Sequence, residues 1–206
     1  MVCMGRAIAH GRTAAPKFSD PTALTLLPPE ARAEVERFRA APAPRGLRAR
    51  VRHGYLQGLE SMMVGRTVAI DEAIRARTPV TQVVILGAGL DGRAWRLPEL
   101  SGAVVFEVDH PDTQQEKRAR SGSLPSAARE IRFVPVDFTR DSLDVALTHA
   151  GHDVTAPTTW VWEGVIPYLT QAEVEATLDV VGRRSATGSR LVATYQRRSL
   201  SRVLVG

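Results

Sequence analysis

Residues 83–93 read Val83-Val84-Ile85-Leu86-Gly87-Ala88-Gly89-Leu90-Asp91-Gly92-Arg93. The four apolar residues at the start have the length of a buried strand, and two glycines spaced one apart end it. The next apolar segment, residues 104–109, ends in Asp109, which lies 22 residues after Gly87. A strand, a glycine turn and a second strand that ends in an acid are typical of α/β proteins that bind an adenosine-containing cofactor.

The glycine turn by itself leaves the type of cofactor open. Residues 87–92 also fit the pattern G-x-G-x-x-G of dinucleotide-binding proteins, which alone is a weak signal. Two side chains weigh against a nicotinamide cofactor: Asp91 and Arg93 crowd the place where a pyrophosphate needs bare amides, and the charge of Asp91 would repel it. We therefore expect a cofactor without phosphate and keep an NAD(P)-dependent oxidoreductase as the less favoured alternative.

The composition predicts one globular unit of 206 residues, with 44% hydrophobic and 24% charged residues. No apolar run approaches the ~20 residues that cross a bilayer. The N-terminus lacks the apolar core of a secretion signal. A single cysteine, Cys3, rules out an internal disulfide and any multi-cysteine zinc site. We expect a cytoplasmic protein that does not bind a membrane.

The formal net charge is +5, and almost all of the positive charge is arginine. The arginines are scattered, aromatic residues make up only 5%, and no nucleic-acid recognition motif accompanies them. The pattern favours a solvated basic surface over nucleic-acid binding. His149 and His152 are the one histidine pair with close spacing, and we expect them on a surface loop without a metal ion.

The chain divides into two regions of different texture. Residues 1–79 predict a loosely ordered arm over 1–27, a helix that begins at Pro28-Pro29, and two further helices over 47–62 and 66–77. Residues 80–206 alternate between apolar strands and helices. The strands are expected over 82–86, 104–108, 131–136, 159–162 and 190–195. Such strands predict an α/β fold with a Rossmann-like, mostly parallel sheet of about five strands, covered on both faces.

Helices are expected between these strands. One follows Pro111 over 112–120, and another covers 141–150. Thr170-Gln171-Ala172-Glu173 is a capping box that begins a third. Trp160 and Trp162 are expected in the core, because aromatic residues on strands usually pack there.

Ligands of an open parallel sheet bind outside the carboxyl ends of its strands. Each of the first four expected strands ends in a glycine turn or an acid there, namely Gly87 and Gly89, Glu107 and Asp109, Asp137, and Glu163. Any one of these carboxylates could simply cap the segment that follows it. Their meeting at one edge favours a binding site.

Four segments in order resemble the motifs of the leucine carboxyl methyltransferase-like family of S-adenosylmethionine-dependent methyltransferases, which includes bacterial O-methyltransferases. They are residues 86–97, 106–111, 133–138 and 162–169. Residues 65–71 are similar to the family's arginine-containing helix, and 18–21 faintly echo its N-terminal arm. The resemblance implies a class I methyltransferase sheet with S-adenosyl-L-methionine as cofactor. It also implies O-methylation of a carboxyl or hydroxyl group on a small molecule.

The resemblance further implies roles for individual residues. Arg66 would pair with the methionine carboxylate, and Glu163 would line the site near the cofactor's amino end. The backbone at Gly87 and Gly89 would pass under the methionine part. Three more positions would bind the nucleoside: Asp109 the ribose hydroxyls, Asp137 the adenine amino group, and the Phe138 backbone the ring edge. Residues 1–79 would cover this cofactor site. No catalytic base is identified, although His110 and Tyr168 lie near the predicted rim.

The chain departs from the family's pattern in two places. Gly92 stands where the family usually carries threonine, which removes a hydroxyl contact or a cap. The sequence also stops at Gly206, shortly after the expected fifth strand, where the family continues with a lid segment and two more strands. We expect cofactor binding to survive better than turnover, and the alternative is a cofactor-binding protein without turnover. A second copy of the chain is an expected partner that covers the edge of the fifth strand.

Overall fold

The computed structural model describes residues 1–40, 45–76 and 79–195. Its centre is a five-stranded parallel sheet in the order β3-β2-β1-β4-β5. The strands are β1 (Gln82–Leu86), β2 (Val104–Asp109), β3 (Glu130–Pro135), β4 (Thr158–Trp162) and β5 (Arg190–Ala193). The α/β fold class is thereby confirmed. All five strands lie where the sequence predicts them, and no strand end differs by more than two residues.

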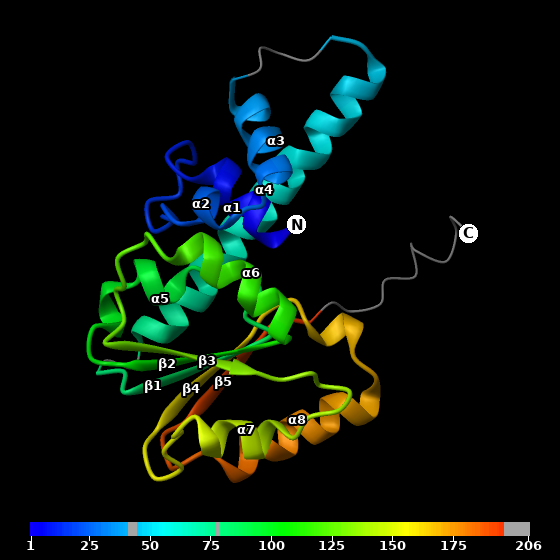
Figure 1. Cartoon of the computed structure of the whole chain (residues 1–206). Coiled ribbons are helices and arrows are strands. Elements are labelled where there is room, and N and C mark those ends of the chain that lie inside the picture. Colours follow the sequence, from blue (N-terminus) through cyan, green and yellow to red (C-terminus); the bar gives the residue numbers. More distant parts are fainter. Residues whose placement is uncertain (41–44, 77–78, 196–206) are drawn as a thin grey trace.

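Helices cover both faces of the sheet (Figure 1). One face carries the second half of α4 (Leu47–Arg75), α5 (Arg93–Arg96) and α6 (Pro111–Ser121), and the other carries α7 (Leu143–His149) and α8 (Gln171–Arg183). Two short 3-10 helices, η1 (Pro98–Leu100) and η2 (Ile166–Tyr168), lie in the connections. The capping box at the start of α8 is present with both of its hydrogen bonds. Among the described residues, no helix combines the length and the apolar composition that a membrane crossing requires.

Alternate residues of each strand enter two separate cores. Val83 and Ile85 pack under α4 and α5, whereas Val84 and Leu86 pack on the α7/α8 side. Trp160 and Trp162 are fully buried in the second core, as expected. Because both faces are covered, the central strands are largely apolar instead of alternating regularly with polar residues.

The N-terminal segment is ordered, and the expectation of a loose arm over residues 1–27 is wrong. It forms α1 (Val2–Ala9) and α2 (Ala23–Leu26), which are followed by α3 (Pro29–Ala40). Helix α1 packs against α4 so closely that a Cβ atom at Gly5 would lie 2.6 Å from Met63 Cγ. The sequence gives little helix signal there because α1 is short, and contacts with distant residues stabilise it.

Helix α4 is one continuous helix of 29 residues, although the sequence suggests two. No proline interrupts it, and its buried residues continue through Met63, Val64 and Thr67. The predicted end of the second helix at Arg77 and Thr78 lies outside the described residues.

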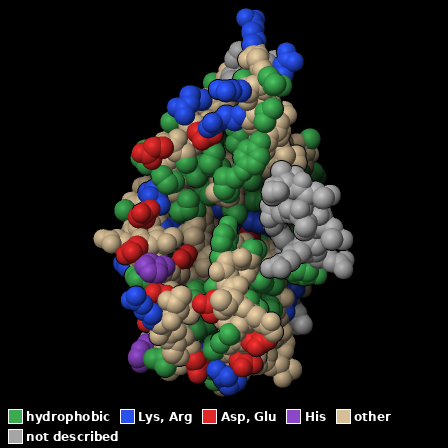
Figure 2. Space-filling model, turned by 90° about the vertical axis from the view of Figure 1, so that its right-hand side faces the viewer, with side chains coloured by type: hydrophobic (Ala, Val, Ile, Leu, Met, Phe, Trp, Pro, Cys, Tyr) green, Lys and Arg blue, Asp and Glu red, His purple; other side chains and the backbone are tan. Residues whose placement is uncertain are grey.

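The first half of α4 leaves the sheet and projects with α3 as a hairpin (Figure 1). Its predicted apolar face is largely exposed there, with Leu47 79% and Val51 66% accessible, whereas Leu56 and Leu59 are buried. Hydrophobic and basic side chains are both visible on this part of the surface in Figure 2. The expected helix is therefore present, but its apolar spacing does not place the whole face in the core.

Candidate functional site

The glycine turn follows β1 at the carboxyl edge of the sheet. Gly87 and Gly89 have φ values of +65° and +46°, which side chains with a Cβ rarely adopt. A Cβ atom at Gly87 would also overlap Val165, which belongs to the loop after β4. Gly87 is thus required by the backbone conformation and by a protein neighbour, and a close approach to ligand is not needed to explain it.

A hollow of about 220 Å³ lies over this turn. Its walls come from three segments that are distant in the sequence: the start of α1, the glycine turn, and residues 163–165 after β4. Helix α1 therefore contributes one wall of the candidate site, which the sequence did not indicate. Cys3 lines the hollow too, but burial raises the pKa of its thiol to about 11, so it is protonated at neutral pH and is a poor nucleophile.

Asp109 closes the turn from the end of β2. Its Oδ2 accepts a hydrogen bond from the Gly89 backbone N–H, and its Oδ1 accepts one from the His110 N–H at 2.7 Å. The carboxylate is fixed beside the glycine turn, as the strand–turn–strand pattern predicts. His110 itself caps α6, because its Nδ1 accepts from the Asp112 N–H at 3.3 Å.

Arg66 and Glu163 meet beside the hollow. Arg66 Nε lies 2.8 Å from Glu163 Oε1, and the two side chains are 19% and 7% exposed. Glu163 lines the hollow. The Nη2 atom of Arg66 is buried and has no hydrogen-bond partner among the described residues. The site therefore offers an adjacent positive and negative group, with one guanidinium nitrogen free to bind an anion.

Asp137 and Phe138 follow β3 and do not line this hollow. The Oδ1 atom of Asp137 accepts hydrogen bonds from the Thr139 hydroxyl at 2.7 Å and the Thr139 backbone N–H at 2.9 Å. These bonds lower the pKa of Asp137. Phe138 packs against the α7/α8 core. The adenine-binding role of these two residues stays a prediction.

Asp91 is not available to repel a pyrophosphate, contrary to the argument from its sequence position. It is buried and paired with the Arg93 guanidinium, and its Oδ1 accepts from the Arg93 backbone N–H at 2.7 Å. Burial opposes the charge of Asp91, but Arg93, Arg6 and Lys117 outweigh that effect and hold its pKa well below the usual range. Because its charge is compensated, Asp91 does not discriminate between the two cofactor classes.

Arg93, which the sequence indicated only as crowding the place of a pyrophosphate and to which no binding role was assigned, contacts three carboxylates. It is 1% exposed and pairs with Asp71 at 2.8 Å, with Asp91, and with Glu163 at 2.8 Å. The sequence signal that could have found it is an arginine two residues after the acid of a glycine turn. Its partner Asp71 lies on α4 and could not be paired with it from the sequence.

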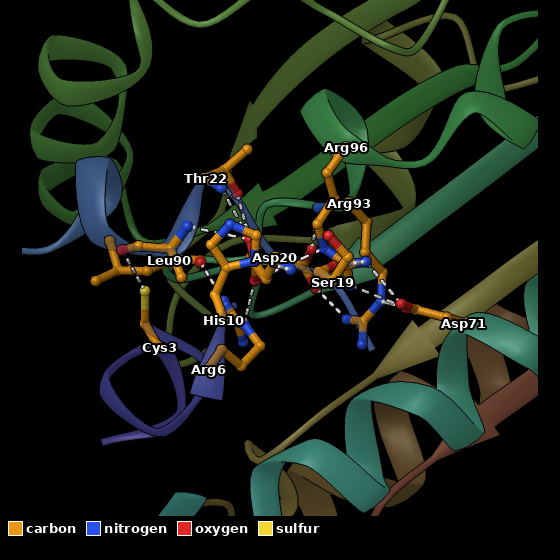
Figure 3. A network of polar contacts seen from close by, with 12 residues as sticks. Cys3, Arg6, His10, Ser19, Asp20, Thr22, Asp71, Leu90, Arg93 and Arg96 are labelled. Carbon is orange, nitrogen blue, oxygen red and sulfur yellow. Dashed lines mark hydrogen bonds and ion pairs between the residues drawn. The ribbon is translucent and has the colours of Figure 1, made fainter. Parts of the chain in front are cut away.

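A polar network joins this cluster to the N-terminal segment (Figure 3). Arg96 pairs with Asp71 at 2.6 Å and lies 3.6 Å from Asp20. Asp20 pairs with Arg6 at 2.7 Å, and Arg6 donates to the Leu90 carbonyl in the glycine turn at 2.6 Å. The network thus connects α1 to the glycine turn through Leu90, and to α5 through Asp20 and Arg96.

Gly92 has a structural reason in this chain. A Cβ atom there would overlap the Thr22 hydroxyl and lie 3.2 Å from Thr22 Cβ. A threonine from the N-terminal segment therefore occupies the space beside position 92. The sequence suggested that glycine at this position costs a hydroxyl contact. In the structure, the glycine avoids a steric conflict with Thr22, whose Oγ1 donates to Asp20 at 2.7 Å.

The sequence analysis grouped Glu107 with the acids at the carboxyl ends of the strands. In the structure, Glu107 lies inside the protein and not at that edge of the sheet. It is fully buried and pairs with Lys117 of α6 at 2.7 Å. His152 is likewise buried between Phe106 and Trp160, so its expected place on a surface loop is wrong. Within the described ranges, no three His, Cys, Asp or Glu side chains gather as metal ligands would.

Fold and site together define the class: an α/β protein with a Rossmann-like parallel sheet and a candidate ligand site at its carboxyl edge. The sequence pattern of the leucine carboxyl methyltransferase family matches residues 1–182, and the chain belongs to this family.

Curated relatives are similar to this chain over part of their length. A protein of Mycobacterium marinum is 46% identical over 123 residues, which cover 58% of this chain and 40% of the relative. One of Mycobacteroides abscessus is 47% identical over 117 residues, covering 55% and 38%. Both are named "Putative S-adenosyl-L-methionine-dependent methyltransferase". The chain thus spans less than half the length of these relatives.

A solved structure, the glycopeptide N-methyltransferase MtfA, is 17% identical with a TM-score of 0.43. The similarity covers 62% of this chain and 51% of that one.

Proposed function

We propose that this chain binds S-adenosyl-L-methionine at the carboxyl edge of its sheet, as part of a methyltransferase that acts on an oxygen of a small molecule. The observation that carries the proposal is the set of charges around the glycine turn. Asp109 is fixed at the end of β2, and Arg66 and Glu163 present opposite charges beside the hollow. Membership of the leucine carboxyl methyltransferase family and the names of the relatives support the choice of cofactor.

The residues present fit the amino-acid end of this cofactor. That end carries one carboxylate and one ammonium group, and the site holds one guanidinium and one carboxylate side by side. Arg66 would bind the carboxylate through its free Nη2, and Glu163 would accept from the ammonium. The backbone at Gly87 and Gly89 would carry the methionine part, and Asp109 would accept from the ribose hydroxyls.

When bound, the cofactor would supply an activated methyl group, which passes to an acceptor oxygen as the carbon–sulfur bond breaks and S-adenosylhomocysteine leaves. The chain's own residues then act by binding and orienting the two reactants. A carboxylate acceptor is already ionised, whereas a hydroxyl acceptor would benefit from a general base. No catalytic base is assigned: His110 Nδ1 is engaged as the α6 cap, and Tyr168 is 86% exposed. A carboxyl acceptor therefore needs the fewest additional groups.

The remaining expectations belong to the same proposal. Residues 1–79 would cover the cofactor site, and 80–206, of which 196–206 lie outside the described residues, would form the Rossmann-like part of one compact unit. Helix α1, which lines the hollow, supports this division. A cytoplasmic location and a second copy of the chain that covers β5 are also proposed. Among the described residues, β5 pairs only with β4, which supports the second idea.

Binding of S-adenosylhomocysteine, measured by isothermal titration calorimetry, tests the proposal. We expect the wild-type chain to bind and Asp109→Ala to lose binding. Asp179→Ala is the matched control, because Asp179 is an exposed acid on α8 and far from the glycine turn. Unchanged binding in Asp109→Ala would refute the site.

A second titration with NADPH, followed by its fluorescence, separates the cofactor classes. Enhancement by NADPH without S-adenosylhomocysteine binding would favour the oxidoreductase. Cofactor binding without a methylated product from any acceptor would favour a binding protein without turnover.

A further inference from the structure

The Glu163 carboxylate is held from two sides by guanidinium groups. Its Oε1 faces Arg66 Nε at 2.8 Å, and its Oε2 faces Arg93 Nη1 at 2.8 Å. The two arginines differ in their surroundings: the Arg66 side chain is 19% exposed, and the Arg93 side chain is 1% exposed. Arg66 thus stands on the accessible side of Glu163, and Arg93 supports it from the interior.

On the side that faces α4, Arg93 is held by groups that do not line the hollow. Its Nε donates to Asp71 Oδ1 at 2.8 Å, and Arg96 holds the same Asp71 with two hydrogen bonds of 2.6 and 3.0 Å. Its backbone N–H and its Nη1 both bond Asp91. The position of the Arg93 guanidinium is therefore set by α4 and the glycine turn, without help from a ligand.

The charges around Glu163 alternate in a way that suits a zwitterion. The protein supplies a cation at Arg66, an anion at Glu163 and a second cation at Arg93. An ionised carboxylate has about four acceptor positions, and two of those on Glu163 are used by the arginines. The others remain for an ammonium group. When Arg66 Nη2 binds the ligand's carboxylate, Arg93 is the one of these two partners of Glu163 that makes no contact with the ligand.

We propose that Arg93 is a positioning residue for the amino-acid end of the cofactor, because it fixes Glu163 while Arg66 binds the ligand's carboxylate. The inference rests on the proposed function. It assigns Arg93 no contact with the ligand. It predicts that a change at Arg93 weakens binding only of ligands that carry the amino-acid end.

Two ligands separate this role from a general structural one. S-adenosylhomocysteine carries the amino and carboxyl groups, whereas 5′-methylthioadenosine shares the nucleoside and lacks both. Arg93→Lys keeps the positive charge but cannot reach three carboxylates from one nitrogen. In calorimetric titrations we expect Arg93→Lys to weaken S-adenosylhomocysteine binding by about tenfold or more, with methylthioadenosine affinity within about threefold of wild type. Arg93→Gln should show a larger loss with the same selectivity.

Arg184→Lys is the matched control. Arg184 is also a buried arginine with several hydrogen bonds, to Asp144, Thr148 and His152, but it lies on the α7/α8 side. We expect this variant to lose stability without a change in either affinity. Equal losses for both ligands in Arg93→Lys, or no loss for either, would overturn the inference while leaving the cofactor site intact. Failure of Arg93→Lys to fold, with Arg184→Lys folded, would assign Arg93 to stability alone and also overturn it. A wild-type chain that binds neither ligand would refute the proposed function itself.

Discussion

The Nε atom of Arg66 lies 2.8 Å from Oε1 of Glu163, so two residues expected to bind opposite charges of one ligand pair with each other. One comes from α4 and the other from the end of β4, 97 residues later in the chain. Their pairing keeps two partly buried charges compensated without a ligand. A zwitterionic ligand can take over both charges without leaving either one unpaired.

Arg66→Met should therefore reduce ligand binding more than it reduces stability. Glu163 keeps its bond to Arg93, so no carboxylate is left without a partner. Loss of a charge-assisted hydrogen bond predicts a roughly tenfold to hundredfold weaker affinity for S-adenosylhomocysteine, measured by calorimetry. Arg52→Met is the control, because Arg52 forms an exposed pair with Glu34 on the α3–α4 hairpin. Equal affinities in the two variants would contradict the role of Arg66.

Gly92→Ala should destabilise the chain by about 1–3 kcal/mol, because the added Cβ would overlap the Thr22 hydroxyl. The backbone at Gly92, with φ of −108°, is open to other residues, so the cost is steric. Thr22→Gly removes the conflicting atoms, and the two changes together should cost less than the sum of the single changes. Urea unfolding of all four proteins measures the coupling. A coupling of zero would mean that Thr22 does not fill this space.

Glu107 should make stability depend on pH between about 4.5 and 7. Burial raises the pKa of Glu107 to about 7, against the opposing effect of Lys117. The folded chain therefore holds a proton there that the unfolded chain has released. The resulting stabilisation is complete below about pH 4.5 and is lost as the pH rises through about 7.

In Glu107→Gln this dependence should disappear. As the pH rises from 5 to 8, the free energy of unfolding of the variant should increase relative to that of the wild type by on the order of 1–3 kcal/mol. Urea unfolding at several pH values measures it. Glu36→Gln, which changes an exposed acid on α3, is the control and should leave the pH profile as in wild type. A constant difference between wild type and Glu107→Gln would contradict the raised pKa.

Local patterns in the sequence account for the sheet. The apolar run before Gly87, the acid at Asp109 and the capping box at Thr170 each depend on neighbours within a few residues, or on strand ends that any parallel sheet brings together. These signals predicted the strands, the α/β class and the edge where the candidate site lies. They also placed Asp109 beside the glycine turn, because parallel strands align their carboxyl ends.

Only the tertiary structure decided which charges meet. Arg93 pairs with Asp71 across 22 residues and with Glu163 across 70, and Arg6 reaches Leu90 across 84. The sequence gives the charge of each residue but not its partner. Asp91, for example, is expected from the sequence to repel a pyrophosphate, but it is buried and its charge is compensated by Arg93. Helix α1 was missed for the same reason, since its stability comes from packing on α4. The sequence by itself thus determined the sheet and the edge where the candidate site lies, because periodicity and turns are local. The tertiary structure determined the ion pairs and the N-terminal wall of the site, because these depend on contacts between residues far apart in the chain.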